Sequence, residues 1–301
     1  MDKKKIIVTG ASGFVGQNLV GYLEKLGFEV SALSLRNEEW KTEIDLSAFG
    51  IVHLAGLAHD LKNTNKEEDY FRVNTELTKE LYQVYLKSSM KKFIYFSSVK
   101  AVADRLGETV LLEEHKADPQ TPYGKSKRKS EVYILANQAP EKEVYIVRPC
   151  MIHGPGNKGN LNLLYKMISK GIPYPFAAFE NLRSFLSIDN LNFGIGEFCT
   201  RNIQGGVYNF ADDEPISTTE LIDIIYQGIE KRNKKLRVSK KLIQIIAKFG
   251  DVIPIPFNSE KLKKLTESYI VSNSKIINAI GKKFPVSTQE GLLKTIKSFK
   301  K

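Results

Sequence analysis

Three glycines at a strand-to-helix turn constrain this chain more than any other feature. Residues 6–9, Ile-Ile-Val-Thr, have the composition of a buried strand, and Gly10, Gly13 and Gly16 follow at once. Residues 14–26 then place apolar side chains at helical spacing. Glycines at such a turn allow a tight bend and close approach to a pyrophosphate, which the N–H groups of the helix N-terminus can bind. In this context the spacing predicts a dinucleotide-binding loop rather than an ordinary turn.

The first half of the chain alternates short apolar runs with longer helical patterns, as parallel βαβ units do. The expected strands are 6–9, 29–35, 51–55, 93–97 and 144–147, and the expected helices are 14–26, 67–88 and 123–138. Right-handed crossovers between them build a doubly wound parallel sheet. After Gly154-Pro155-Gly156 the pattern becomes irregular.

These patterns predict an α/β fold with two domains. Residues 1–155 form a dinucleotide-binding, Rossmann-type domain with a doubly wound parallel sheet. Residues 156–301 form a smaller mixed α/β substrate-binding domain, part of which packs back on the first. The ligand is expected in the cleft between them.

Composition excludes several classes of protein. With 301 residues and 42% hydrophobic content the chain can bury a large core, and no apolar run approaches the roughly 18 residues of a membrane span. Two cysteines, Cys150 and Cys199, make no disulfide framework and fit a reducing cytoplasm. The four histidines lack metal-ligand spacing, so no metal is assigned. The net charge of +11 comes from scattered lysines, which favours solvated faces over a nucleic-acid partner.

Residues 240–249 form a basic amphipathic pattern in which apolar residues stand among Lys240, Lys241 and Lys248. Such a helix can pack against the second domain or lie on an acidic membrane. Burial is the simpler interpretation, and the membrane interpretation stays open.

The end of the second expected strand bears on the choice of cofactor. An NAD site usually has a carboxylate there, bonded to the ribose 2′-hydroxyl. This chain has Ser34 and Arg36 instead, and its acidic residues, Glu38 and Glu39, come later. A hydroxyl and a guanidinium suit a 2′-phosphate, so the sequence favours NADP over NAD. The alternative is that Arg36 is only an exposed loop cation.

Tyr123 and Lys127 form a candidate catalytic pair. They lie four residues apart, on one face of a helix that Pro122 opens, and no other tyrosine of the chain has a lysine four positions on. A phenol has an ordinary pKa of about 10, so it needs a nearby positive charge to act as a base at neutral pH. Ser98 ends an expected strand, where its hydroxyl could bind the substrate oxygen.

Together these motifs resemble the extended short-chain dehydrogenase/reductase superfamily, that is, the NAD(P)-dependent epimerase/dehydratase family. The resemblance is closest to nucleotide-sugar 4-epimerases and 4-keto-sugar reductases of bacterial surface-polysaccharide synthesis, and it covers essentially the whole chain. The matching segments are 10–16, 53–56, Asn74, Ser97-Ser98, 122–127, Arg148-Pro149, 154–156, 183–191, Phe284-Pro285 and 290–292.

The resemblance implies a role for each matching residue. Tyr123 is the general acid/base, Lys127 lowers its pKa and binds the nicotinamide ribose, and Ser98 holds the substrate oxygen. Asn74 helps to hold the fold around the cofactor. The other implied cofactor-binding residues are Gly10, Gly13, Phe14, Gly16, Leu54, Ala55 and Pro149, and the implied substrate-binding residues besides Ser98 are Asn160 and Arg183. A homodimer through residues 76–87 and 126–138 is a further expectation from the resemblance.

Departures from the family pattern leave alternatives open. After Ser98 the family often has Val-Tyr-Gly, whereas this chain has Val-Lys-Ala at 99–101. The expected function is therefore a UDP-hexose 4-epimerase or a 4-ketoreductase, and a preference for NADPH favours the reductase. A 4,6-dehydratase would need an acid and base after Ser98, which are missing. A non-catalytic NADP sensor would usually have lost Tyr123 and Lys127.

Overall fold

A six-stranded parallel sheet is the centre of the fold. The computed structural model describes residues 3–57, 66–107, 109–157, 159–233, 236, 238–252 and 258–300. The strands run in the spatial order β10-β6-β4-β3-β1-β2, and every neighbouring pair is parallel. Their bounds are β1 Lys5–Thr9, β2 Glu29–Leu33, β3 Gly50–His53, β4 Lys92–Phe96, β6 Glu143–Pro149 and β10 Gly206–Phe210. The predicted doubly wound parallel sheet is confirmed.

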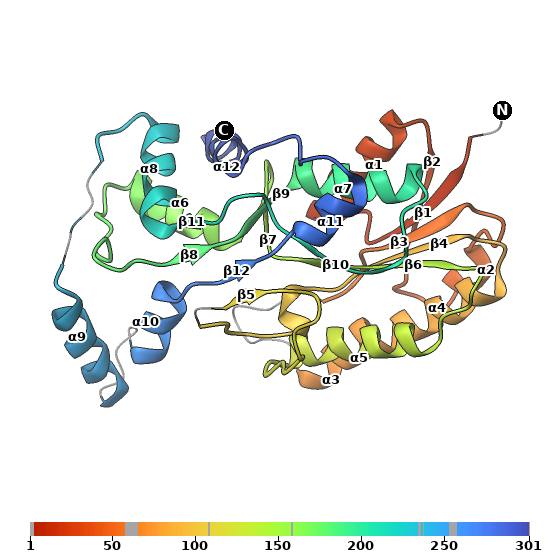
Figure 1. The fold of residues 1–301 in the computed structure, drawn as a ribbon, viewed down its shortest axis with the longest axis horizontal. Helices are drawn as coiled ribbons and strands as arrows, with labels where there is room; N and C mark the ends of the chain where they lie inside the picture. Colours follow the sequence, from red (N-terminus) through yellow and green to blue (C-terminus); the bar gives the residue numbers. More distant parts are fainter. Residues whose placement is uncertain are drawn as a thin grey trace.

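Helices cover both faces of this sheet (Figure 1). One core contains side chains of α1, α7 and α11, and the other contains side chains of α2, α4 and α5. The central strands are almost fully buried, which explains why their sequences are continuous apolar runs. The helices are α1 Phe14–Lys25, α2 Trp40–Glu43, α4 Leu77–Lys87, α5 Pro122–Ala136, α7 Ile188–Thr200 and α11 Ser274–Ile280.

The order of the strands reverses beside β1. From β1 the chain crosses to β2 on one side, and it then returns to β3 on the other side. Ligands of open α/β sheets bind outside the carboxyl ends of the strands at such a reversal. Thr9 and His53, which end β1 and β3, are paired neighbours and therefore mark the expected crevice.

The stretch predicted as one helix over 67–88 is interrupted. It consists of α3 (Glu67–Tyr70), a π-helical segment η1 (Phe71–Glu76) and α4. Short π-helical segments often lie at functional sites, because they re-aim one turn of side chains. Here the re-aimed turn contains Asn74.

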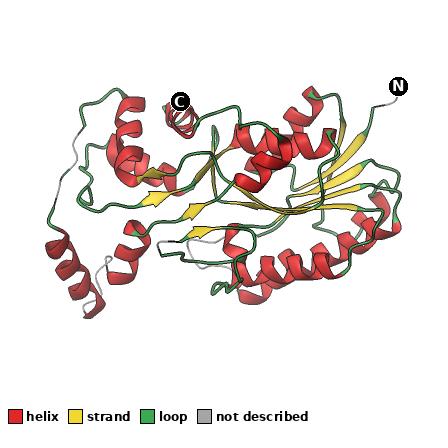
Figure 2. Ribbon diagram, in the orientation of Figure 1, coloured by secondary structure: helices red, strands yellow, loops and turns green. Residues whose placement is uncertain are grey.

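The second half of the chain adds a smaller layer around the carboxyl ends of the sheet (Figure 2). Its core packs α6, α8 and α12 against short strands. Two short strands of the first half, β5 Val110–Leu111 and β7 Met151–His153, pair with β12 and β9 of this layer. The elements of the second half are α6 Asn160–Ser169, β8 Leu182–Arg183, β9 Phe185–Ser187, β11 Ile216–Ser217, α8 Thr218–Ile229, α9 Lys240–Val252, α10 Ser259–Thr266, β12 Ile270–Val271 and α12 Thr288–Ser298. Capping boxes at Ser217 and Ser287 begin α8 and α12.

Segments from the second half of the chain also pack into the structure around the six-stranded sheet. β10 is the edge strand beside β6, and α7 packs against α1. The buried Lys92 Nζ donates to the carbonyl oxygens of Phe198 and Arg201 at the end of α7, where a cation is favoured by the helix dipole. The domain boundary at residue 155 stays a prediction. Within the described residues, no helix is long and apolar enough to span a membrane.

Candidate functional site

The glycine loop between β1 and α1 is shaped by close backbone contacts. Gly10 has a φ of 71°, and a Cβ atom there would lie 2.8 Å from the Ala55 nitrogen. A Cβ atom on Gly16 would overlap the Gly10 carbonyl oxygen. Gly13, whose N–H donates to that same oxygen at 3.0 Å, is the N-cap of α1 and has no side chain to cover the helix end. The loop therefore fits an anion such as a pyrophosphate at the start of α1.

The floor of the crevice is a hydrogen-bonded chain between β1, β3 and α4. Thr9 Oγ1 accepts from the Ala55 N–H at 3.2 Å and lies 2.7 Å from His53 Nδ1. His53 Nε2 lies 2.9 Å from Thr78 Oγ1. Burial, with a smaller contribution from the charge of Lys127, lowers the pKa of His53 to about 3, so the ring is neutral at pH 7. His53 thus braces the floor as a structural residue.

The remaining predicted cofactor residues lie at the start of α1 and at or just beyond the carboxyl ends of β2, β3 and β6. Ser34 and Arg36 are exposed just beyond the carboxyl end of β2, next to β1. Phe14 is the first residue of α1, and its ring approaches Gly154. Leu54 and Ala55, half-buried, follow β3, and Pro149, buried, ends β6.

The three predicted catalytic residues meet at the carboxyl end of β4. Thr121 caps α5 by accepting from the Gly124 N–H at 3.2 Å, which places Tyr123 in the first helical turn. The Tyr123 side chain is hydrogen-bonded to Ser98. One turn later, Lys127 Nζ donates to the Phe96 carbonyl oxygen at 2.8 Å. Ser98 and Lys127 are buried, and Tyr123 is half-buried.

Burial dominates the electrostatics of this set. It raises the pKa of Tyr123, while the hydrogen bond to Ser98 lowers that pKa and the nearby Tyr70 raises it. The Tyr70 ring stands edge-on to that of Tyr123, with centroids 6.2 Å apart. Burial also lowers the pKa of Lys127 to about 8, against the opposing effect of Glu131. The side chains alone therefore favour the protonated phenol, and a lowered Tyr123 pKa stays a prediction for the complex with cofactor.

A buried ion pair fixes α5 against the sheet. Glu131, one turn after Lys127, accepts from Arg148 Nε and Nη2 of β6, each at 2.8 Å. The same carboxylate accepts from Ser97 Oγ at 2.5 Å and from Arg128 Nη1 at 3.0 Å. Because Ser97 precedes Ser98, this carboxylate ties the Ser98 backbone to the helix that carries Tyr123 and Lys127.

Asn74 connects two parts of the site, the loop after β3 and helix α5. Its side chain is fully buried, donates to the Leu57 carbonyl oxygen and to Ser126 Oγ, and accepts from the Leu57 N–H at 2.7 Å. A Cβ atom on Gly56 would lie 2.8 Å from Asn74 Oδ1 and 3.2 Å from Lys127 Nζ. Asn74 therefore holds the loop after β3 close to Lys127.

The predicted substrate residues lie in the second half. Arg183 lies in β8, half-buried, and burial lowers its pKa against the opposing effects of Tyr174 and Glu267. Tyr269 pairs with this strand through its backbone, and its hydroxyl donates to the Ala103 carbonyl oxygen at 2.7 Å. This contact ties Arg183 to the loop that follows Ser98. Asn160 begins α6, but its side chain lies outside the described residues.

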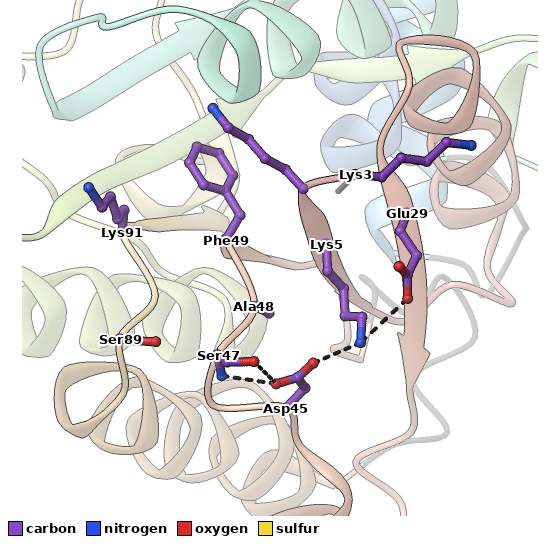
Figure 3. Close-up of a pocket in the computed structure, with 10 residues that line it drawn as sticks. Lys3, Lys5, Glu29, Asp45, Ser47, Ala48, Phe49, Ser89 and Lys91 are labelled. Carbon is purple, nitrogen blue, oxygen red and sulfur yellow. Dashed lines mark hydrogen bonds and ion pairs between the residues drawn. The ribbon is translucent and has the colours of Figure 1, made fainter. Parts of the chain in front are cut away.

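A surface hollow at the amino-terminal ends of the strands, opposite the glycine loop, is a separate feature (Figure 3). It lies where the strands begin, between Lys5, Glu29 and Asp45. Lys5 Nζ pairs with Asp45 at 2.8 Å and with Glu29 at 3.4 Å, so these three side chains are occupied with one another. Parallel sheets bind ligands at their carboxyl ends, and the glycine loop lies there.

Comparison with known families agrees with this geometry. Residues 6–209 match the model of the NAD dependent epimerase/dehydratase family. The chain belongs to this family.

Relatives within the epimerase/dehydratase family cover nearly the whole chain. The UDP-glucose 4-epimerase of Vibrio cholerae is 30% identical, over 98% of this chain and 95% of the relative. An Escherichia coli O157:H7 protein named N-acetyl-alpha-D-glucosaminyl-diphospho-ditrans,octacis-undecaprenol 4-epimerase is 27% identical, over 94% and 86%. Among solved structures, UDP-glucuronic acid 4-epimerase from Bacillus cereus, in complex with NAD, has a TM-score of 0.75 at 19% identity, over 98% and 96%. These relatives are 4-epimerases, and the family is one of NAD-dependent enzymes.

Sequence reasoning missed the positioning residues of this epimerase/dehydratase site. Glu131 continues the four-residue row of Tyr123 and Lys127 on α5, and that spacing was the available signal. Thr9 and Thr78, which hold His53, left no comparable pattern, because their strand and helix are far apart in sequence.

Proposed function

We propose that this protein is a nicotinamide-dependent 4-epimerase of a nucleotide-activated hexose, with a UDP-hexose as its substrate. The observation that carries the proposal is the meeting of Ser98, Tyr123 and Lys127 at the carboxyl end of β4, on a sheet whose glycine loop suits a dinucleotide. The names of the Vibrio and Escherichia relatives both support 4-epimerisation, and the Vibrio name supports a UDP-hexose as the substrate. A role in the synthesis of surface-polysaccharide precursors is part of the same proposal.

The residues have separate tasks in this mechanism. A nicotinamide bound at the glycine loop would supply a reversible hydride acceptor for the sugar carbon. Tyr123 accepts the hydroxyl proton as that carbon is oxidised and gives it back as the carbon is reduced. Ser98 donates a hydrogen bond to the oxygen on which negative charge develops. The ammonium of Lys127, with a pKa of about 8, is mostly charged at pH 7 and favours the phenolate of Tyr123.

The binding residues divide between the two halves of the chain. The N–H groups at the start of α1 and the close backbone at Gly10, Gly13 and Gly16 suit the cofactor pyrophosphate. Phe14, Leu54, Ala55 and Pro149 line the cofactor channel, and Asn74 positions it. Asn160 and Arg183 are the proposed contacts for the diphosphate of the nucleotide sugar.

The direct test is incubation of the purified protein with UDP-glucose, UDP-N-acetylglucosamine and UDP-glucuronic acid, and with each C4 epimer. Interconversion, separated by anion-exchange chromatography, is the expected result with at least one pair. The Tyr123→Phe variant is the matched control. A wild-type protein that contains cofactor and converts no pair in either direction would contradict the proposal.

A specific observation favours a second candidate, an NADPH-dependent reductase of 4-keto sugars. No carboxylate follows β2 at positions 34–36, and Arg36 is exposed there, where it could meet a 2′-phosphate. Denaturing the protein and identifying the released nucleotide separates the two. Stoichiometric NAD supports the epimerase, whereas a protein that binds NADPH more tightly than NADH and releases no NAD supports the reductase.

The proposal also includes a cellular compartment and an oligomeric state. The free cysteines, Cys150 and Cys199, support a reducing cytoplasm. Exposed Val132 and Leu135 on α5 support a homodimer through α4 and α5. Light scattering after size exclusion should give twice the chain mass for the wild type and the single mass for Val132→Glu.

A further inference from the structure

One face of α9 exposes a cluster of large apolar side chains. Leu242 is 50% exposed, Ile245 51%, Ile246 44% and Phe249 60%. Positions 242, 245, 246 and 249 follow the i, i+3, i+4, i+7 pattern, so they form one stripe along the helix. Single exposed apolar residues are ordinary on protein surfaces, but four in one stripe mark an interaction site.

The stripe is not the face with which α9 packs on the protein. Ile243 and Ala247 are buried in a small cluster with Leu262 of α10, and Phe176 and Phe179 pack against it. The two helices stand together at the end of the molecule remote from the N-terminus, beside the body of the second half (Figures 1 and 2). The exposed stripe faces away from this small cluster, so the sequence prediction of burial holds for only one side of α9.

The charges around the stripe are mainly positive. Lys241 and Lys248 are exposed and lie together on one edge of α9, whereas the described side chains of α10 expose one charge of each sign, Lys263 and Glu260. The acidic side chain of Asp251 is held by Ser259, accepting from its N–H at 3.0 Å and from its hydroxyl at 2.6 Å. The whole chain carries a net charge of +11. A partner for this face therefore combines an apolar layer with negative charge.

A bilayer containing anionic lipids has this combination of properties. A helix of 13 residues is about 20 Å long and can lie in the headgroup layer, with its apolar face at the acyl boundary and its lysines at the phosphates. We infer that α9 is a docking helix for anionic membrane surfaces, and that the protein binds such surfaces reversibly through Leu242, Ile245, Ile246 and Phe249. The inference does not depend on the reaction that the site performs.

Co-sedimentation of the full-length protein with vesicles tests whether the apolar stripe of α9 binds membranes. Binding is expected to vesicles of phosphatidylcholine with 30 mol% phosphatidylglycerol, and much less to phosphatidylcholine alone. Ile245→Ser combined with Phe249→Ser should weaken binding at least tenfold. Leu26→Ser combined with Leu46→Ser removes exposed apolar residues from other surfaces and should leave binding unchanged.

Single lysine substitutions test the electrostatic contribution to membrane binding, with exposed lysines from other surfaces as controls. Lys241→Gln and Lys248→Gln should each weaken binding about fivefold at low salt, whereas the exposed Lys87→Gln and Lys283→Gln should not. Circular dichroism and sugar conversion of each variant verify its fold independently of vesicles.

Three results would overturn the inference. The first is no binding of the wild type to anionic vesicles, and the second is equal binding of the Ile245/Phe249 double variant. The third is a wild-type dimer that this variant converts to a monomer, without vesicle binding, which would make the stripe a contact between copies of the chain. Failure of sugar conversion alone would contradict only the proposed function.

Discussion

Replacing Glu131 with Gln should destabilise the protein strongly, because it leaves Arg148 without its counter-charge. Arg148 is 3% exposed, and both of its bonds to Glu131 are 2.8 Å long. Removing one partner of a buried pair costs about 3–5 kcal/mol of the free energy of unfolding. Unfolding entropy is about 2.1 cal/mol/K per residue, so the 301-residue chain has about 0.6 kcal/mol/K, and the melting temperature should fall by roughly 5–8 °C.

Differential scanning calorimetry of the cofactor-free protein measures this shift, and Glu76→Gln is its matched control. Glu76 pairs with Lys79 at 3.0 Å on the surface of the same side of the sheet, with half of its side chain exposed. Exposed pairs contribute at most about 1 kcal/mol, so the control should move the melting temperature by less than about 2 °C. Equal shifts for the two variants would refute the reasoning about burial.

The same variant should change the pH dependence of the reaction if Glu131 supports Lys127. The charge of Glu131 raises the pKa of Lys127, so its removal should take that pKa further below the value of about 8. The ammonium is then lost at lower pH, and the falling limb of rate against pH should shift toward acid. A purely structural role would lower the rate at every pH and leave the limb in place.

Three more predictions follow from single contacts. Tyr123→Phe should lower turnover by about 10²–10⁴-fold while calorimetric titration shows nearly unchanged cofactor affinity, and a loss under tenfold would contradict its proton-transfer role. Gly16→Ala should weaken cofactor binding or folding, since its Cβ overlaps Gly10. Gly21→Ala on the same helix should melt normally, because no described atom outside the local helix backbone lies within 4 Å of a Cβ there. His53 has its pKa lowered to about 3, so the unfolded chain binds its proton first and stability should fall as the pH drops from about 6.5 toward 3. Urea denaturation at pH 7 and 4.5 should show a smaller pH effect in His53→Gln.

Much of the sheet could be predicted from the sequence, because parallel strands buried on both faces leave continuous apolar runs. The runs at 51–55 and 93–97 correspond to β3 and β4 for this reason. β10 was not predicted, although it completes the same sheet. Its segment, 206–210, begins at the second of two consecutive glycines, and no local pattern shows that it joins the edge beside β6.

The candidate site also has one part that could be predicted from the sequence and one part that could not. The spacing of Tyr123 and Lys127 could be predicted, since both lie on one regular helix. The π-helical turn at 71–76 could not, because the contacts of Asn74 with Leu57 and Ser126 come from distant segments. Local periodicity thus predicts which residues share a face, and tertiary hydrogen bonds decide where that face points.

The buried carboxylate of Glu131 explains how one helix, α5, can meet two requirements at once. Lys127 needs burial to act near Tyr123, yet burial alone favours the neutral amine. Glu131 lies one turn away, where its charge opposes that effect, while Arg148 and Ser97 satisfy its hydrogen bonds. The same carboxylate therefore supports the charge of the lysine and locks the helix against β4 and β6, so a change there should alter rate and stability together.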